Sequence, residues 1–245
     1  MSGFGRSRRR RWTSCGKIFG YRICTINTEE ESPVRTGGGD DGKSSLLDGV
    51  RRPKDDIAFE TLGSVDEAQV TLGVCRSLVR EWRDRIAGTE DTGARSGKRN
   101  GLLSRSRSDR SQPGTVALLR SLDEDLARIQ NELLIAGGIL STSIGDTVPE
   151  TMPRIGTAEI EVLSKTFARW RGVVHIEPRF FIAGDSRIGA EFDRARTVIR
   201  RAERNVVRLI RERGNQAQIP VSQYLNQLSD LCFVLARWTD TVSDR

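Results

Sequence analysis

Apolar residues recur at intervals of three and four along several segments of the chain, and this periodicity restricts the possible folds more than any other feature. Four long segments with this spacing span residues 65–86, 116–140, 192–209 and 221–235, and a shorter one spans residues 158–170. On an α-helix such spacing places the apolar side chains in one stripe, as the core-facing helices of a bundle require. The alternation typical of strands is almost absent. The sequence therefore predicts an all-α helical bundle.

The excess positive charge of the chain is concentrated at its N-terminus. Residues 1–28 contain 7 arginines and lysines and no acidic residue, whereas the whole chain has 40 basic and 33 acidic residues. We predict that residues 1–33 form a basic, disordered arm. The same composition fits a mitochondrial transit peptide, or residues upstream of the true start codon. The expected location is the cytoplasm, or the mitochondrial matrix if the arm is a transit peptide.

A second unusual segment, at residues 88–115, is rich in glycine, serine and arginine. Such a composition buries too little apolar surface to fold, so we predict a disordered insertion between two helices of a bundle that spans residues 34–240. Its few charges make only a weak case for a nucleic-acid partner. No stretch approaches the ~18 consecutive apolar residues of a membrane helix, so no membrane partner is expected.

The cysteines and the histidine give no sign of a metal site. The four cysteines form no CxxC pair, and the one histidine, His175, has no histidine or cysteine neighbour at ligand spacing. A zinc site built from protein side chains is therefore not expected. Cys75 and Cys232 fall in apolar helical patterns, where buried free thiols are the expected state.

Residues 34–56, which precede the first periodic segment, are rich in glycine. Closely spaced glycines let the backbone turn several N–H groups toward one anion, and Lys43, Ser44 and Ser45 add further donors. The stretch is not a Walker loop, because neither the spacing nor the strand–helix context of GxxxxGK[ST] is present. A plain flexible loop is the alternative interpretation.

Residues 196–204, RTVIRRAER, hold four arginines and one glutamate within the third long periodic segment. On a helix, Arg196 and Arg200 lie one turn apart, and Glu203 follows on the same face. In the last periodic segment Asn226 and Asp230 are likewise one turn apart. Such polar rows are either solvated surface or a binding site for a polyanion such as the triphosphate of ATP.

Five segments of the chain resemble, in order, motifs of the PduO-type ATP:cob(I)alamin adenosyltransferases. They are GGDDGKSSLLDG with RRPKDD at 38–56, LGSVDEAQVTLG at 62–73, FFIAGDS at 180–186, ARTVIRRAERNVV at 195–207 and YLNQLSDLCFVLAR at 224–237. The shared order makes the resemblance specific, and it covers most of residues 34–237. The arm and the insertion lie outside it.

The resemblance implies a ferritin-like five-helix bundle that forms a homotrimer with active sites between subunits. The implied reaction transfers the 5′-deoxyadenosyl group of ATP to the cobalt of cob(I)alamin, with Mg²⁺ as cofactor, and yields adenosylcobalamin and inorganic triphosphate. The implied protein partners are a cob(II)alamin reductase and an adenosylcobalamin-dependent mutase. The alternative is a non-catalytic homologue that binds ATP or corrinoid, or that acts like a chaperone.

Residues that match the family's motifs carry its site onto this sequence. The resemblance implies catalytic roles for Arg196 and Arg200 and assigns no metal ligand. The implied ATP-binding residues are Gly39, Asp40, Gly42, Lys43, Ser44, Ser45, Lys54, Arg196, Arg200, Glu203 and Asn226. The implied corrinoid-binding residues are Phe180, Asp66 and Asp230, with Phe181 as the alternative to Phe180. Asp66 is expected to pair with Arg196 across the subunit interface.

The sequence departs from the family pattern at several positions. Gly37 stands where the family loop has a lysine, and Arg35 or Lys43 is expected to replace its phosphate contact. Gln69 replaces a common asparagine, and Ala183 replaces a frequent proline.

Overall fold

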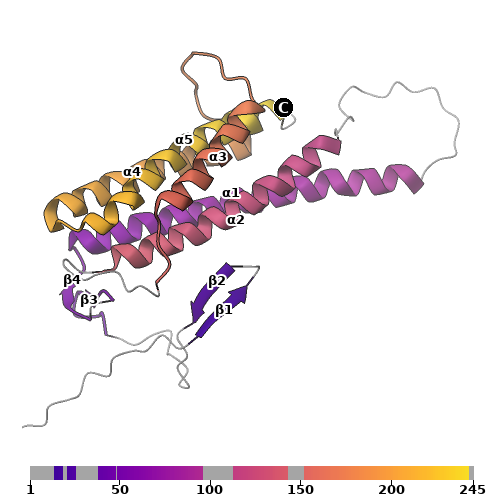
Figure 1. The fold of residues 1–245 in the computed structure, drawn as a ribbon. Coiled ribbons are helices and arrows are strands. Elements are labelled where there is room, and N and C mark those ends of the chain that lie inside the picture. The colour runs from indigo at the N-terminus through magenta and orange to yellow at the C-terminus, as the bar shows by residue number, and fades with distance from the viewer. Residues whose placement is uncertain are drawn as a thin grey trace, which may run out of the picture. The chain divides into compact units, whose positions relative to one another are not determined.

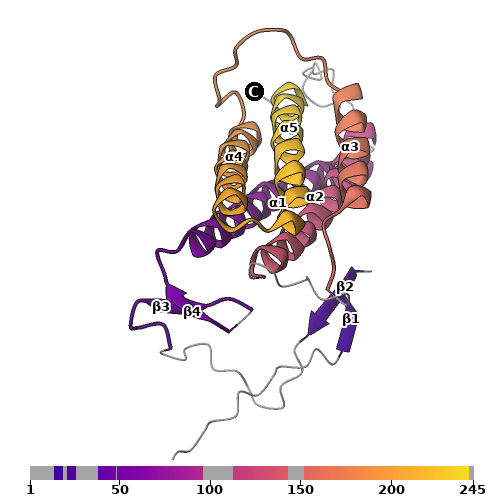
Figure 2. The ribbon, with the colours of Figure 1, turned by 60° about the vertical axis from the view of Figure 1, so that its left-hand side comes forward.

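The computed structural model describes residues 14–18, 21–25, 38–47, 49–95, 113–142 and 152–242. The chain divides into two units, residues 1–41 and residues 42–245. Five α-helices make up most of the second unit (Figures 1 and 2): α1 (Ile57–Arg95), α2 (Pro113–Leu140), α3 (Thr157–Gly172), α4 (Arg187–Arg213) and α5 (Ile219–Val242). Each helix contains one of the five periodic segments, so the predicted all-α bundle is confirmed.

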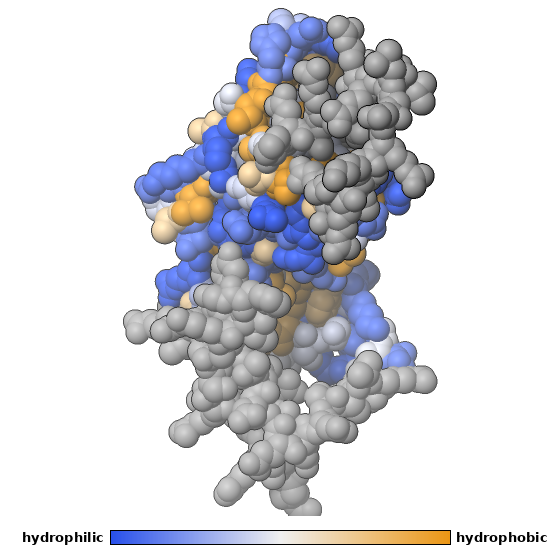
Figure 3. All heavy atoms as spheres, turned by 90° about the vertical axis from the view of Figure 1, so that its right-hand side faces the viewer, coloured by the Kyte–Doolittle hydropathy of each residue, from blue (hydrophilic) through white to orange (hydrophobic). Residues whose placement is uncertain are grey.

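The helices bury their apolar stripes against one another. α1 packs against α2 and α4, and α5 packs against α4 and α3. Three tryptophans from α1, α3 and α5 meet in the core, where the Trp238 ring centroid lies 6.0 Å from that of Trp82 and 4.8 Å from that of Trp170. Hydrophilic residues predominate on the face shown in Figure 3, with apolar residues in patches between them. This distribution is the one that inward-facing stripes produce.

Polar side chains define where two of the helices begin. The Asp56 carboxylate accepts a hydrogen bond from the Ala58 N–H (2.9 Å), and so caps α1. Ser186 caps α4, because its hydroxyl accepts from the Gly189 N–H at 2.9 Å. A side chain that accepts a hydrogen bond from an otherwise unpaired N–H group of the first turn typically stabilises a helix by about 1 kcal/mol. The caps therefore fix the start of α1 and α4, two of the three helices that carry predicted site residues.

A short hairpin precedes α1, within the glycine-rich stretch for which an anion-binding loop and a plain flexible loop were the two alternatives. β3 (Lys43–Ser45) pairs antiparallel with β4 (Arg51–Pro53), with Lys43 opposite Pro53. The Leu47 N–H donates to the Ser141 carbonyl (3.2 Å) and so attaches the hairpin to the end of α2. Strands of three residues are too short to show an alternation in the sequence.

The first unit contains a second hairpin, which corrects the expectation of a wholly disordered arm. β1 (Ser14–Ile18) pairs antiparallel with β2 (Tyr21–Thr25), and Cys15 lies opposite Cys24. Tyr21, Ile23 and Thr25 have the high strand propensity of aromatic and β-branched residues, which the surrounding arginines obscure. The rest of the predicted arm, residues 1–13, 19–20 and 26–33, lies outside the described residues.

The helices overlap both ends of the predicted insertion at 88–115. α1 continues to Arg95, and α2 begins at Pro113, a first helical position that proline tolerates. Disorder between them stays a prediction, because residues 96–112 lie outside the described part of the chain. None of the helices in the described ranges is both long and apolar enough to cross a membrane.

Candidate active site

A pocket of about 530 Å³ opens between the loop that precedes α4 and the facing sides of α4 and α5. The loop contributes Phe180 and Phe181, α4 contributes Arg196, and α5 contributes Phe233 and Arg237. One side of the pocket is therefore aromatic and the other is cationic. The sequence motifs assigned Phe180 and Arg196 to the site and gave Phe181 as an alternative to Phe180. They did not assign Phe233 or Arg237, and the fold brings all five residues to one pocket.

The aromatic side consists of one fixed pair of rings and one free ring. Phe181 packs edge-on against Phe233, with ring centroids 5.8 Å apart. Phe180 is fully exposed at the rim, and Ile182 is 90% exposed beside it. Large exposed apolar side chains at the mouth of a pocket mark a surface that a ligand or a partner covers.

The cationic side contains two buried N–H donors. The Arg196 side chain is 36% exposed, and its Nε lies 4.0 Å from the Asp193 carboxylate. The Arg196 and Arg237 Nε atoms are both buried and have no hydrogen-bond partner among the described residues. Arg237 is almost fully buried and forms ion pairs with Asp193 (2.5 Å) and Asp240 (3.0 Å).

The remaining predicted residues of α4 and α5 lie beyond this pocket. Arg200 is exposed one turn after Arg196, and Glu203 is half-buried. On α5, Asn226 and Asp230 are both exposed on the turns that lead to the pocket. Arg201, by contrast, forms an ion pair with Glu67 of α1 and so contributes to packing between helices.

The β3–β4 hairpin brings the predicted ATP-binding lysines to one end. Gly42 has φ 77°, a left-handed conformation that favours glycine, and its carbonyl accepts from the Lys54 N–H at 2.9 Å. Lys43 follows directly as the first residue of β3 and leads into Ser44 and Ser45. Gly39 and Asp40 lie in a turn that belongs to the first unit, residues 1–41.

The hairpin lies near the C-terminal end of α4, whereas Arg196 lies in the N-terminal half of that helix. The Arg213 guanidinium at the end of α4 donates to the Asp56 carboxylate at 2.6 Å, two residues after Lys54. Arg196 lies almost five turns earlier in α4, which is about 26 Å along the helix axis. A lysine side chain spans only about 6 Å. The structure therefore does not bring Lys54 together with Arg196 within one chain.

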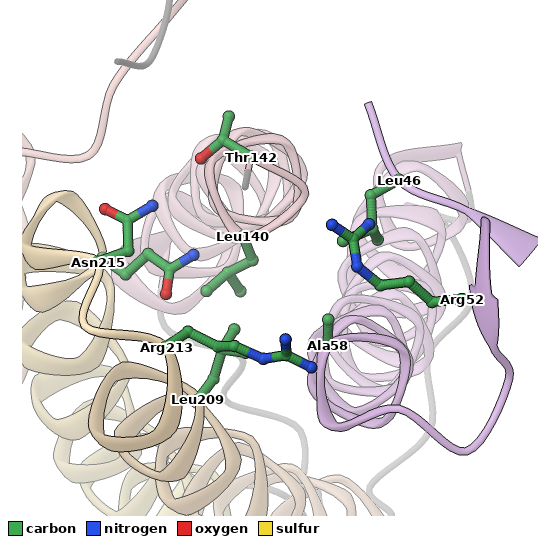
Figure 4. A pocket seen from close by; sticks show the side chains of 9 residues that line it. Leu46, Arg52, Ala58, Leu140, Thr142, Leu209, Arg213 and Asn215 are labelled. Atoms are coloured by element: carbon green, nitrogen blue, oxygen red, sulfur yellow. The ribbon is translucent and has the colours of Figure 1, made fainter. Parts of the chain in front are cut away.

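A smaller cavity of about 150 Å³ lies where the hairpin meets the bundle. Figure 4 shows Arg52 of the hairpin and Arg213 of α4 extending toward it from opposite sides, with the Arg213 guanidinium beside Ala58 of α1. Leu46 of the hairpin also lines the cavity and packs against the core. These contacts hold the hairpin on the end of the bundle.

Some sequence predictions for the site concern features that one chain does not contain. Asp66 is exposed on α1, and its predicted pairing with Arg196 involves a second subunit. Gly37 and Arg35 lie outside the described residues. Within the part of the chain that the structure describes, no group of three or more histidine, cysteine, aspartate or glutamate side chains is placed to hold a metal ion.

Sequence reasoning did not single out Asp193 and Arg237. The available signal was the spacing of Phe233 and Arg237, which lie one turn apart on the helix that carries Asn226 and Asp230. Their contacts with α4 and with the loop depend on how the helices pack, and no local pattern reports this.

The family model described as cobalamin adenosyltransferase matches residues 34–95 and 100–239. The chain therefore belongs to the cobalamin adenosyltransferase family, as the resemblance predicted. A corrinoid adenosyltransferase of Mycobacterium tuberculosis is 28% identical over 204 residues, which cover 83% of this chain and 86% of the relative. One of Mus musculus is 28% identical over 224 residues, which cover 89% of this chain and 78% of the relative.

The fold has solved counterparts. One is a variant PduO-type ATP:corrinoid adenosyltransferase from Lactobacillus reuteri, complexed with cobalamin and ATP. It matches with a TM-score of 0.63 and 22% identity, and the match covers 85% of this chain and 91% of that one. This likeness confirms the five-helix bundle.

Proposed function

We propose that this protein is an ATP:corrinoid adenosyltransferase, which transfers the 5′-deoxyadenosyl group of ATP to the cobalt of a reduced corrinoid and releases inorganic triphosphate. The pocket that combines Arg196 with an aromatic wall is the observation that carries this proposal. A polyphosphate requires fixed cations, and a large, mostly apolar macrocycle requires aromatic surface. Membership of the cobalamin adenosyltransferase family supports the same reaction.

The arginines of α4 stabilise the leaving group. Negative charge grows on the triphosphate as its bond to the 5′ carbon breaks, and guanidinium groups stay charged and bond phosphate oxygens in pairs. Arg196 and Arg200 point from one face of a rigid helix, so they need no rearrangement as this charge develops. We assign two further side chains to ATP: Glu203, which is half-buried, and Asn226, which is exposed.

The other contribution of the protein is alignment. The reduced cobalt is already a strong nucleophile, so the chain need not supply a general base. The corrinoid itself provides the reactive centre, and the protein provides binding and orientation. Holding the two substrates in line can lower the barrier by about 7–11 kcal/mol. We assign the exposed Phe180 ring to the face of the corrinoid, and the packed Phe181 ring to the wall behind it. Asp66 and Asp230 remain the proposed polar contacts of the corrinoid.

Mg²⁺ fits this site as a partner of the phosphates. The ion commonly takes one or two carboxylates and completes its shell with substrate phosphates and water. Glu203, half-buried beside Arg200, is the carboxylate that would hold it. When bound, the ion neutralises charge on the triphosphate.

We further propose that each ATP site is shared between two copies of the chain in a homotrimer. The hairpin precedes Asp56, which pairs with Arg213, and Arg213 lies about 26 Å along α4 from Arg196, so we infer that the two halves meet only if a neighbouring copy supplies one of them. The hairpin would then close over ATP bound to the neighbour's arginines, and Gly39 and Asp40, which precede it in the sequence, remain proposed ATP-binding residues. The predicted pairing of Asp66 with Arg196 belongs to the same interface.

The wider cellular setting follows from the substrate. Because the corrinoid must arrive reduced, we propose a cob(II)alamin reductase upstream and an adenosylcobalamin-dependent mutase downstream. We propose a cytoplasmic location, with the mitochondrial matrix as the alternative.

The direct test is an adenosylation assay with purified full-length protein. Chemically reduced cobalamin, ATP and Mg²⁺ should yield a product with the photolabile absorption spectrum of adenosylcobalamin, together with inorganic triphosphate. Omission of ATP is the control for non-enzymatic reoxidation. Absence of product at micromolar protein, with ATP binding retained in equilibrium dialysis, would establish a non-catalytic binding protein instead.

A further inference from the structure

A buried arginine that lines the pocket lies against its two packed phenylalanine rings. The Arg237 guanidinium carbon lies 4.8 Å from the ring centroid of Phe181 and 5.4 Å from that of Phe233. Arg237 is only 4% exposed. A cation over an aromatic face is attracted by the ring, and the attraction is stronger when both are removed from water. Arg237 therefore joins α5 to the loop that carries Phe180.

Two carboxylates hold this guanidinium in one orientation. Its Nη2 atom is 2.5 Å from Asp193 of α4 and 3.0 Å from Asp240 of α5. Asp240 also accepts from the Ser186 hydroxyl, the cap of α4, at 2.7 Å. A Cβ atom added at Gly189 would lie 2.0 Å from the Asp240 carboxylate, so the start of α4 fits closely against this network.

The same network reaches the cationic side of the pocket. Asp193 lies between the two arginines, at 2.5 Å from Arg237 and 4.0 Å from the Nε of Arg196. The loop aromatics and an arginine assigned to ATP are thus restrained through a single carboxylate. A structural ion pair alone would not need to touch both sides of a ligand pocket.

We propose that Arg237 is a positioning residue that fixes Phe181 and Phe233 as the rigid wall of the corrinoid subsite. Asp193, which pairs with Arg237, also lies 4.0 Å from the Nε of Arg196, so the network borders the ATP subsite without a hydrogen bond to that Nε. This inference rests on the proposed adenosyl transfer. Arg237 acts through its neighbours, so its loss should weaken corrinoid binding while it leaves the chemistry of the bound substrates largely intact.

The first test is Arg237→Lys, which keeps the charge but loses the planar group that lies over both rings. We expect the KM for cob(I)alamin to rise about tenfold, as for loss of a desolvated cation–π contact, while kcat changes by about twofold or less. Arg128→Lys is the matched control, because Arg128 is a partly buried arginine, with its side chain 16% exposed and paired with Glu132 at 2.8 Å. An unchanged corrinoid KM in Arg237→Lys, or an equal rise in the control, would overturn the proposal.

Phe181→Leu breaks the same contact from the ring side, so it keeps the test valid if Arg237→Lys folds poorly, and a double-mutant cycle applies where both variants fold. Phe181→Leu removes the ring from a partly exposed position, so the fold should tolerate it. If the two residues act as one unit, the double variant raises the corrinoid KM much less than the product of the single effects. Effects that multiply independently contradict the positioning role.

An activity-independent measurement separates this inference from the proposed function. Hydrogen exchange of residues 179–186 should be faster in Arg237→Lys than in Arg128→Lys, because the loop loses its anchor. Equal exchange in the two variants would refute the anchor, whatever the activity. A wild-type protein without adenosylated product, but with the faster loop exchange in Arg237→Lys, would refute the proposed function alone.

Discussion

If each ATP site combines the hairpin of one copy with the α4 arginines of the next, two inactive variants should restore activity to each other. One variant carries Lys43→Ala with Lys54→Ala and lacks the hairpin half of every site. The other carries Arg200→Ala and lacks the arginine half. The reason to expect this is that Arg213, which contacts Asp56 beside the hairpin, lies about 26 Å along α4 from Arg196 of the same chain.

The size of the recovery follows from ring geometry. In a closed trimer every interface has the same direction, so any trimer that contains both variants has one interface with an intact hairpin facing intact arginines. One site of the three is therefore complete, and a mixed trimer should regain about one third of the activity of a wild-type trimer. A shared site in a twofold dimer would instead give about one half. Sites contained within single chains would give no recovery.

The assay uses two affinity tags. The variants are co-expressed with different tags, purified over both columns so that every oligomer contains both chains, and assayed for adenosylcobalamin. Each variant purified alone sets the background. Mixed oligomers no more active than this background would refute the shared site, provided that both tags are present in one sedimenting species.

Three further predictions concern single groups. Arg200→Ala should lower kcat about a hundredfold with an unchanged melting curve, because one fixed donor to a developing charge is lost; an equal loss in Arg208→Ala, an exposed arginine of the same helix, would contradict this. Burial would raise the pKa of Asp123, but hydrogen bonds from two α1 arginines outweigh it and lower that pKa. Asp123 therefore contributes its full stabilisation above its pKa in the unfolded state, and this stabilisation is lost as the pH falls through its pKa in the folded state. Between about pH 5 and 3 the Tm of Asp123→Asn should thus fall less than that of wild type. Burial raises the pKa of Cys75 to about 12, and it raises the pKa of Cys232 well above its usual value, so a variant with only these two cysteines should not react with a thiol reagent at pH 8 until it is unfolded.

The helices were predictable because the signal for each is local. Each one turns a single stripe toward the core, and the spacing of three and four that makes this stripe is visible in any window of the sequence. The hairpin at 43–53 was not predictable in the same way. Its strands have three residues each, and its position depends on contacts with the ends of α2 and α4.

The candidate site was predictable in part. Arg196 and Phe180 were named from motifs, and the fold places both at one pocket. Whether Phe180 or Phe181 meets the corrinoid was left open, because adjacent residues of an irregular loop carry no periodic signal. Packing separates them: Phe181 lies against Phe233, and Phe180 is exposed.

The sequence by itself determined that the chain forms five amphipathic helices, and its motifs determined the family to which these helices belong. Only the tertiary structure decided that Arg237 lies behind Phe181, and that the hairpin lies at the far end of α4 from Arg196. The physical reason is that helix periodicity depends on neighbours three and four residues apart. Contacts between α4, α5 and the loop depend instead on how whole helices pack, which is settled only when all of their apolar stripes are buried together.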